Sequence, residues 1–135
     1  MDDGNILEWT TTVTSKTIKI YTPDMDFGNP GVKKKVYKFY LTYKGNGSNL
    51  AITAHKNGDD TIASTFHRIS ADGSATITTD STPLLNVGTD DWVCAELKPS
   101  ASLNNVYSVQ LQITGAATDF EINDISVVYR NKRVK

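Results

Sequence analysis

The chain has 135 residues, of which 39% are hydrophobic and 21% are charged, with a net charge of −1 and a single cysteine, Cys94. This length predicts one domain and is sufficient to bury a hydrophobic core. One cysteine excludes an internal disulfide and a multi-cysteine metal site, and no apolar run reaches the roughly 18 residues of a membrane-spanning helix. We therefore expect a single domain with no membrane partner.

The polarity of the chain predicts the domain boundaries. Residues 1–15 begin with a polar stretch and continue into a run of threonines, which indicates an N-terminal arm or an edge strand. Residues 16–130 carry the alternating apolar pattern of a β-sandwich domain, and residues 131–135 form a basic C-terminal tail. The domain is thus expected to have a short extension at each end.

Residues 34–44 carry the clearest strand pattern in the chain. Aromatic and aliphatic side chains on the parity of Tyr37 and Tyr43 alternate with lysine and threonine on the other parity. A two-residue period is typical of a strand with one buried face and one solvent-exposed face. Similar apolar or alternating runs predict further strands over residues 16–21, 50–55, 62–69, 75–79, 92–97, 106–114 and 120–130.

Turn motifs that contain glycine separate these predicted strands. Asn46-Gly47, Asn57-Gly58 and Asp72-Gly73 each predict a hairpin, because both central residues tolerate the positive φ of a type I′ turn. The segment Asn29-Pro30-Gly31-Val32 predicts a type II turn immediately before the strand over residues 34–44.

The last predicted strand changes the parity of its apolar side chains. They occupy even positions up to Ile122 and odd positions from Ile125 onward. One extra residue keeps both groups on the core side, so we predict a β-bulge at Asn123-Asp124. Together, these patterns predict an all-β fold, a two-sheet antiparallel jelly-roll β-sandwich of about eight strands.

Candidate metal ligands lie around one predicted turn. His55 and His67 flank it, and Asp59 and Asp60 lie between them. The alternative interpretation is that these histidines are surface residues beside a turn, because their spacing matches no known ligand motif. Paired carboxylates such as Asp90-Asp91 suit Ca²⁺, yet the sequence of a Ca²⁺-binding loop is not present. We therefore expect no metal ion and no cofactor.

The sequence contains no recognisable catalytic motif. Cys94 lacks an adjacent base that would activate its thiol, and we expect it to be a buried or half-buried residue. A hydrolase would need two carboxyl groups opposed in a cleft, and no sequence pattern places two in that way. We expect a protein that is not an enzyme.

The charged residues are strongly segregated along the chain. Residues 27–58 contain six lysines and no acidic residue, whereas residues 59–124 contain ten acidic residues and two basic ones. Such segregation can form patches of opposite sign that favour packing against further copies of the chain. Alternatively, neighbouring strands mix the two signs. Because the total charge is negative, we expect no nucleic-acid partner.

Several aromatic residues do not fit comfortably inside a small core. Trp9, Tyr40 and Trp92 are candidates for exposed rings that stack on a sugar, as in carbohydrate-binding sandwiches. The alternative is that Trp9 and Trp92 close the ends of the core, where large amphipathic rings are common.

Three stretches together carry a resemblance to a known group of proteins. They are Asp26 to Lys38, Gly88 to Ser108, and Phe120 to Arg130 with the basic residues that follow. The chain resembles the C-terminal β-domain of uncharacterised virion structural proteins of tailed bacteriophages, particularly marine ones. The closing pattern Phe-x-Ile-Asn-Asp-Ile is also similar to the last strand of jelly-roll carbohydrate-binding modules. The first resemblance implies a virion location, contacts with other virion proteins, and a homo-oligomer in the particle.

These observations lead to two hypotheses. In the first, the chain is a non-enzymatic virion component of the tail or neck, or a capsid decoration protein, that acts through protein–protein contacts. Its candidate interface is a charged rim of Lys33, Lys34, Lys35, Arg130, Lys132 and Arg133. In the alternative, the chain is a carbohydrate-binding module for host glycans, with Trp9, Tyr40 and Trp92 as the stacking residues.

Overall fold

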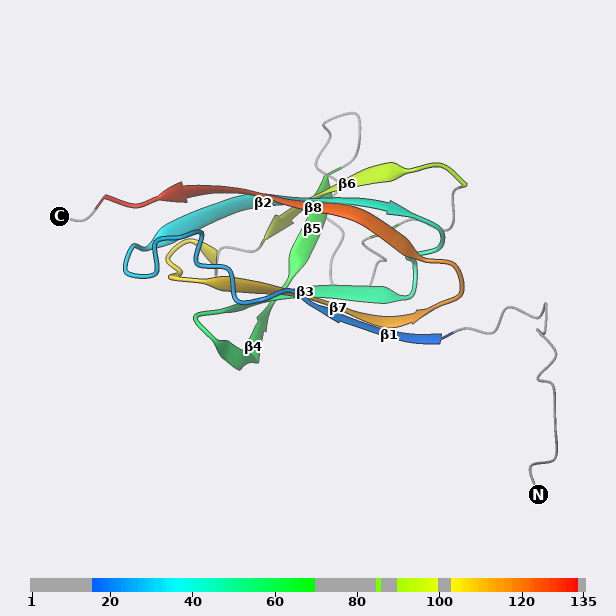
Figure 1. Ribbon diagram of the computed structural model, residues 1–135, viewed down its shortest axis with the longest axis horizontal. Coiled ribbons are helices and arrows are strands. Elements are labelled where there is room, and N and C mark those ends of the chain that lie inside the picture. The colour runs from blue at the N-terminus through cyan, green and yellow to red at the C-terminus, as the bar shows by residue number, and fades with distance from the viewer. Residues whose placement is uncertain (1–15, 70–84, 86–89, 100–102, 134–135) are drawn as a thin grey trace, which may run out of the picture.

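The computed structural model describes residues 16–69, 85, 90–99 and 103–133. Within these ranges the chain forms two antiparallel four-stranded sheets, stacked as the two layers of a β-sandwich (Figure 1). The predicted all-β sandwich is therefore confirmed, while the jelly-roll connectivity stays a prediction. The strands are β1 (Lys16–Tyr21), β2 (Lys34–Lys44), β3 (Leu50–Lys56), β4 (Asp59–Ser64), β5 (Phe66–Ile69), β6 (Val93–Pro99), β7 (Val109–Ala117) and β8 (Glu121–Asn131).

The order of the strands places the core between β7 and β3 on one side and β2 and β6 on the other. One sheet has the order β1-β7-β3-β4 and the second has the order β5-β6-β2-β8. Phe39 of β2 is fully buried and meets the ring of Phe66 of β5 edge to face, with 5.3 Å between the ring centroids. Leu111 and Ile113 of β7 are buried from the opposite sheet. The alternating patterns in β2 and β7 thus supply the two faces of one core.

The bulge predicted in the last strand is present in β8. In the pairing of β8 with β2, Thr42 lies opposite Asp124 and Tyr43 lies opposite Ile122, so Asn123 is the extra residue. The insertion keeps Ile122 and the apolar residues after Asp124 against the core. The prediction of a bulge at Asn123-Asp124 is confirmed.

A second irregularity, at Tyr37, was not predicted. Val36 lies opposite Tyr129 and Lys38 lies opposite Val128, which leaves Tyr37 without a partner in the register. The parity of β2 therefore changes at this residue, and Tyr37 is only half-buried, whereas Val36 is buried. The predicted core-facing row beginning at Tyr37 is wrong at this position.

The hairpin predicted at Asn57-Gly58 is present between β3 and β4. Both residues have positive φ, 56° for Asn57 and 71° for Gly58, as a type I′ turn requires. The hairpin predicted at Asn46-Gly47 is wrong, because β2 and β3 belong to different sheets and the connection crosses between them. Asp72-Gly73 lies outside the described residues.

The loop before β2 contains a turn at the predicted place but of a different type. Val32 N donates to Asn29 O at 3.2 Å, yet Gly31 does not have positive φ, so the predicted type II turn is wrong. The positive-φ pair is instead Phe27 and Gly28, at 56° and 76°. The left-handed backbone conformation thus occurs at Phe27 and Gly28, before the turn over residues 29–32.

The single strand predicted over residues 62–69 is divided between the two sheets. β4 ends at Ser64 in one sheet and β5 begins at Phe66 in the other, so the chain changes layer at Thr65. The predicted strand over residues 75–79 lies outside the described residues. The other predicted strands are confirmed, with ends displaced by a few residues.

The C-terminal strand extends beyond its predicted end. β8 continues to Asn131, and the backbone N–H of Lys132 still donates to Lys33 O at 2.7 Å. The first two residues of the predicted basic tail therefore belong to the edge of the sheet. The predicted arm over residues 1–15 lies outside the described part of the chain.

Candidate functional site

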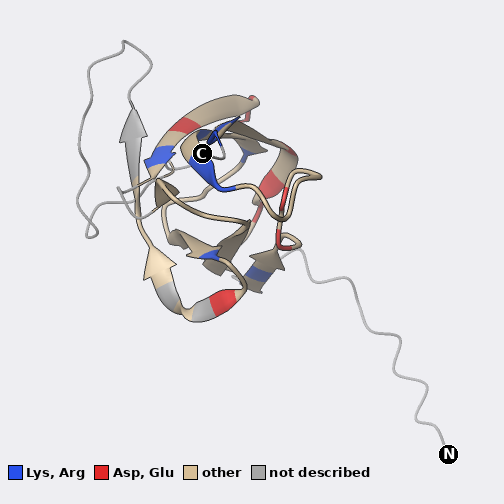
Figure 2. Ribbon diagram, turned by 90° about the vertical axis from the view of Figure 1, so that its left-hand side faces the viewer, with Lys and Arg blue, Asp and Glu red and all other residues tan. Residues whose placement is uncertain are grey.

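The sandwich gathers basic residues from two distant segments at one of its ends. In the pairing of β2 and β8, Lys35 lies opposite Arg130. The backbone carbonyl of Lys33 accepts a hydrogen bond from the backbone N–H of Lys132. Figure 2 shows lysine and arginine positions around the C-terminal end of the ribbon. We name this surface the basic end and define it as Lys33, Lys35, Arg130, Lys132 and Arg133. These five of the six predicted interface residues are exposed or half-buried.

The sixth predicted interface residue, Lys34, is not on the surface. Its side chain is 0% exposed, and its Nζ donates to three backbone carbonyl oxygens. The acceptors are Asn29 O at 2.6 Å, Val32 O at 2.8 Å and Tyr107 O at 2.8 Å. An ammonium group has three donors, and all three are satisfied here. Because the bulge at Tyr37 reverses the parity of β2, Lys34 points inward, and its assignment to an exposed rim is wrong.

The lysines of the basic end contact neutral groups. Lys33 Nζ lies 5.5 Å from the centroid of the Tyr107 ring, and Lys35 Nζ lies 4.9 Å from the centroid of the Tyr37 ring. Both distances are in the range of a cation–π interaction. Lys132 Nζ donates to the amide oxygen of Asn105 at 3.3 Å, from the loop before β7. Since none of these contacts adds negative charge, the basic end remains positive.

Away from this end, neighbouring strands mix the two signs. Lys38 of β2 forms an ion pair with Glu96 of β6. The hydrogen bond to Glu96 raises the pKa of the Lys38 ammonium, although desolvation acts in the opposite direction. The register of β2 and β8 also places Lys44 opposite Glu121. The predicted segregation of charge is therefore retained at the basic end and lost along the middle of the sheet.

The register does not place the candidate sugar-stacking residues Tyr40 and Trp92 side by side, because Tyr40 lies opposite Glu96, four residues beyond Trp92. Trp92 is 50% exposed immediately before β6, so its predicted alternative role as a cap of the core is wrong. Tyr40 is half-buried in β2, between Glu96 and Ser126 in the register of the sheet. Trp9 lies outside the described residues.

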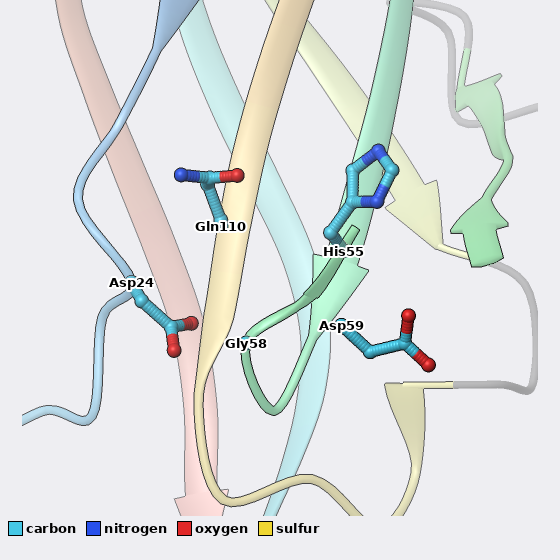
Figure 3. Close-up of a pocket in the computed structure, with 5 residues that line it drawn as sticks. All are labelled: Asp24, His55, Gly58, Asp59 and Gln110. Atoms are coloured by element: carbon cyan, nitrogen blue, oxygen red, sulfur yellow. The ribbon is translucent and has the colours of Figure 1, made fainter. Parts of the chain in front are cut away.

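A small polar hollow lies beside the turn between β3 and β4. It has a volume of about 210 Å³ and is lined by Asp24, His55, Gly58, Asp59 and Gln110 (Figure 3). Asp24 and Gln110 were not singled out from the sequence, because they come from separate segments and carry no local motif. The sequence signals near this hollow were the turn motif Asn57-Gly58 and the candidate metal ligands His55 and Asp59.

The two carboxylates of the hollow are held by hydroxyl groups. Asp24 Oδ2 accepts a hydrogen bond from Ser108 Oγ at 2.8 Å. Asp59 Oδ1 accepts from Thr61 Oγ at 2.5 Å and from Thr61 N at 2.9 Å. The bonds from Thr61 lower the pKa of the Asp59 carboxyl below its ordinary value. These contacts hold the two exposed carboxylates in fixed positions.

The two candidate histidines lie on strands of different sheets, and the interpretation of them as surface residues beside a turn is wrong for His55. His55 is buried in β3, and its Nδ1 has no accessible surface and no hydrogen-bond partner among the described residues. His67 lies in β5, which belongs to the other sheet. Within the described ranges, no three residues among His, Cys, Asp and Glu are grouped so as to hold a metal ion.

Cys94 is exposed, which corrects the prediction of a buried or half-buried thiol. It lies opposite Thr42 in the register of β6 and β2, on the outward face of the sheet. The reason is parity: the neighbouring core residue Ala95 is buried and lies opposite Leu41.

Comparisons of the chain with protein-family models, with curated proteins and with solved structures find no match. In the part of the chain that the structure describes, there is no helix with the length and apolar character needed to cross a membrane. The described part of the chain is thus a two-sheet β-sandwich that carries the basic end where β2 pairs with the C-terminal part of β8.

Proposed function

We propose that the chain is a non-enzymatic structural protein of a tailed-phage particle, and that it binds a neighbouring virion protein through the basic end. The observation that carries the proposal is the convergence of Lys33 and Lys35 with Arg130 and Lys132 at one end of one sheet. Charged groups at the rim of an interface direct association and select partners of opposite charge. The partner is accordingly an acidic surface of another virion protein.

The resemblance to tailed-phage virion domains supports the same role. In this proposal the sandwich has jelly-roll connectivity and belongs to the tail or neck, with capsid decoration as the second location. It needs no cofactor, because it acts by shape and charge.

Two experiments test this function. Mass spectrometry of purified particles of the phage that encodes the chain is expected to detect it, and its absence from intact virions would contradict the proposal. In a second experiment, Lys33→Glu combined with Arg133→Glu reverses the charge at the basic end and is expected to reduce incorporation into particles. Lys19→Glu is the matched control, because Lys19 is exposed on β1 and lies outside the basic end. Equal incorporation of both variants would contradict a role for the basic end.

A second candidate function is supported by the exposure of Trp92. Together with Tyr40 it would provide the aromatic surface of a carbohydrate-binding module for host glycans. A glycan array tests this function, with binding expected for the unmodified chain and lost in Trp92→Ala. An array without binding would exclude it.

A further inference from the structure

The strand β8 forms an open edge of its sheet. It is the last strand in the order β5-β6-β2-β8, and within the described residues it pairs only with β2. Figure 1 shows β8 along the length of the upper layer, with its C-terminal end at the basic end. An edge strand presents unpaired N–H and C=O groups, which can hydrogen bond to a further strand.

The register identifies which backbone groups face this open side. Lys132 N donates to Lys33 O, so the N–H of Lys132 points toward β2. Backbone groups alternate in direction along an antiparallel strand. The backbone N–H and C=O groups of Ile125, Val127 and Tyr129 therefore point away from β2, toward the open side.

The side chains of the same segment carry a symmetric charge pattern. Asp124 lies opposite Thr42 and Arg130 lies opposite Lys35, both on the outward face of the sheet. Asp124 and Arg130 are exposed and lie at equal distances along the chain from Val127, one on either side. Asn123, the bulged residue of β8, lies just outside this segment, and the extra residue at Tyr37 belongs to β2, so β8 has no inserted residue over 124–130.

We propose that β8 pairs with β8 of a second copy of this chain, antiparallel and centred on Val127. This register places Asp124 opposite the partner's Arg130, and the two-fold symmetry repeats the pair at the other end. It also places Ile125 opposite the partner's Tyr129, and Val127 opposite the partner's Val127. Residues 125, 127 and 129, whose backbone groups face the open side, become the hydrogen-bonded positions.

The apolar surface of β8 agrees with this arrangement. Val128 is 43% exposed and Tyr129 is 37% exposed, while Ile125 and Val127 are only partly buried against the core. A partner strand would cover these side chains, and removing apolar surface from water favours association.

The edge strand β1, which also carries exposed apolar residues, does not have the same complementarity. β1 contains Lys16 and Lys19 and no acidic residue, so antiparallel pairing with itself brings like charges together. Charges on an edge strand often prevent pairing, and those of β1 have that effect. The charges of Asp124 and Arg130 in β8 have opposite signs at symmetric positions, which favours pairing with a second copy.

Sedimentation equilibrium of the purified full chain tests the proposal with a charge-swap set. Asp124→Arg places arginine opposite the partner's Arg130, and Arg130→Asp places aspartate opposite the partner's Asp124. Each single variant is expected to raise the dimer Kd about tenfold or more, because both symmetric pairs become repulsive. The double variant D124R/R130D restores both pairs, and an equimolar mixture of the two single variants forms a complementary heterodimer. Both are expected to recover the Kd of the unmodified chain within about threefold.

Three results would overturn the proposal: an unmodified chain that stays monomeric up to about 1 mM, a dimer whose Kd is unchanged by either single variant, or a mixture that fails to recover association. Thermal unfolding of each variant confirms that it folds, and recovery in the mixture requires folded chains. The inference does not depend on the proposed function, because association is measured on the purified chain. Absence from particles would contradict only the virion role, whereas a monomeric chain would contradict only the pairing of β8.

Discussion

At one lateral edge of the sandwich the chain passes from β4 to β5 through the single residue Thr65, whereas at the opposite edge β1 and β8 are separate strands. The connected edge buries Phe66 almost completely. The open edge leaves Ile18 of β1 and Val127 of β8 only partly buried. A covalent connection thus closes the core on one side, whereas on the other side β1 and β8 each pair with one strand only within the described residues.

The largest effect that tests this comparison is expected at the connected edge. Phe66→Ala removes a ring that is 2% exposed and packed against Phe39, and it should lower the free energy of unfolding by about 3–5 kcal/mol. Tyr129→Ala is the matched change at the open edge, where the ring stacks on Phe27 with 4.0 Å between the centroids. It should lower the stability by about 1 kcal/mol. Urea denaturation measures both values, and equal losses would show that the two edges contribute alike.

A smaller loss is expected from the buried lysine beside the open edge. Lys34→Met removes the ammonium that donates to three carbonyl oxygens, of which Asn29 O keeps its bond from Val32 N, and it should lower the free energy of unfolding by about 2–3 kcal/mol. The matched control is Lys35→Met, next along β2, whose half-buried side chain lies over Tyr37. It should change the stability by less than about 1 kcal/mol. Similar unfolding midpoints for the two variants would contradict the structural role of Lys34.

The turn between β3 and β4, on the connected side, should be sensitive to backbone conformation. Asn57→Ala places alanine at φ 56° and removes the acceptor of the hydrogen bond from Tyr107 N, which has a length of 2.7 Å. The expected loss is about 1–2 kcal/mol. Asn57→Gly separates the two causes, since glycine adopts this φ without strain but lacks the acceptor. A higher thermal unfolding temperature for Asn57→Ala than for Asn57→Gly would contradict a contribution from positive φ.

The smallest effect is a pH dependence at Asp59, in the same turn region. Hydrogen bonds from Thr61 lower the pKa of the folded Asp59 carboxyl below its ordinary value of 3.8. The contribution to stability is therefore present above the unfolded pKa and is lost as the pH falls through the folded pKa. An NMR titration of the carboxyl carbon should show the lowered pKa, and Thr61→Val should raise it. A pKa unchanged by Thr61→Val would assign the shift to another group.

The sequence predicted those features that local residues determine. The turn at Asn57-Gly58 follows from two residues that tolerate positive φ, and the bulge at Asn123 follows from the change of apolar parity within one strand. The irregularity at Tyr37 has a weaker signal, since Val36 and Tyr37 are both apolar and either can face the core. The long alternating pattern favoured Tyr37, and the burial of Lys34 was missed for that reason.

Features that depend on distant segments were less predictable. A glycine motif such as Asn46-Gly47 is compatible with a hairpin or with a crossing between sheets, and the position of β3 beside β7 decides between them. The residues of the basic end were predicted, together with Lys34, as one charged rim from the resemblance and the segregation of charge along the chain. Their meeting depends on the pairing of β2 with β8, which brings Lys35 opposite Arg130.

The exposed thiol of Cys94 provides a natural site for a spin label, because no other cysteine is present in the chain. Cys94 lies on β6, two strands from the open edge and level with Asp124 through Thr42. In two copies joined through β8, five strand spacings and the offset along the strands separate the two labelled backbone positions by about 30 Å. Dipolar spectroscopy resolves such separations, so a label on the native Cys94, without any substitution, can report how the two sheets align.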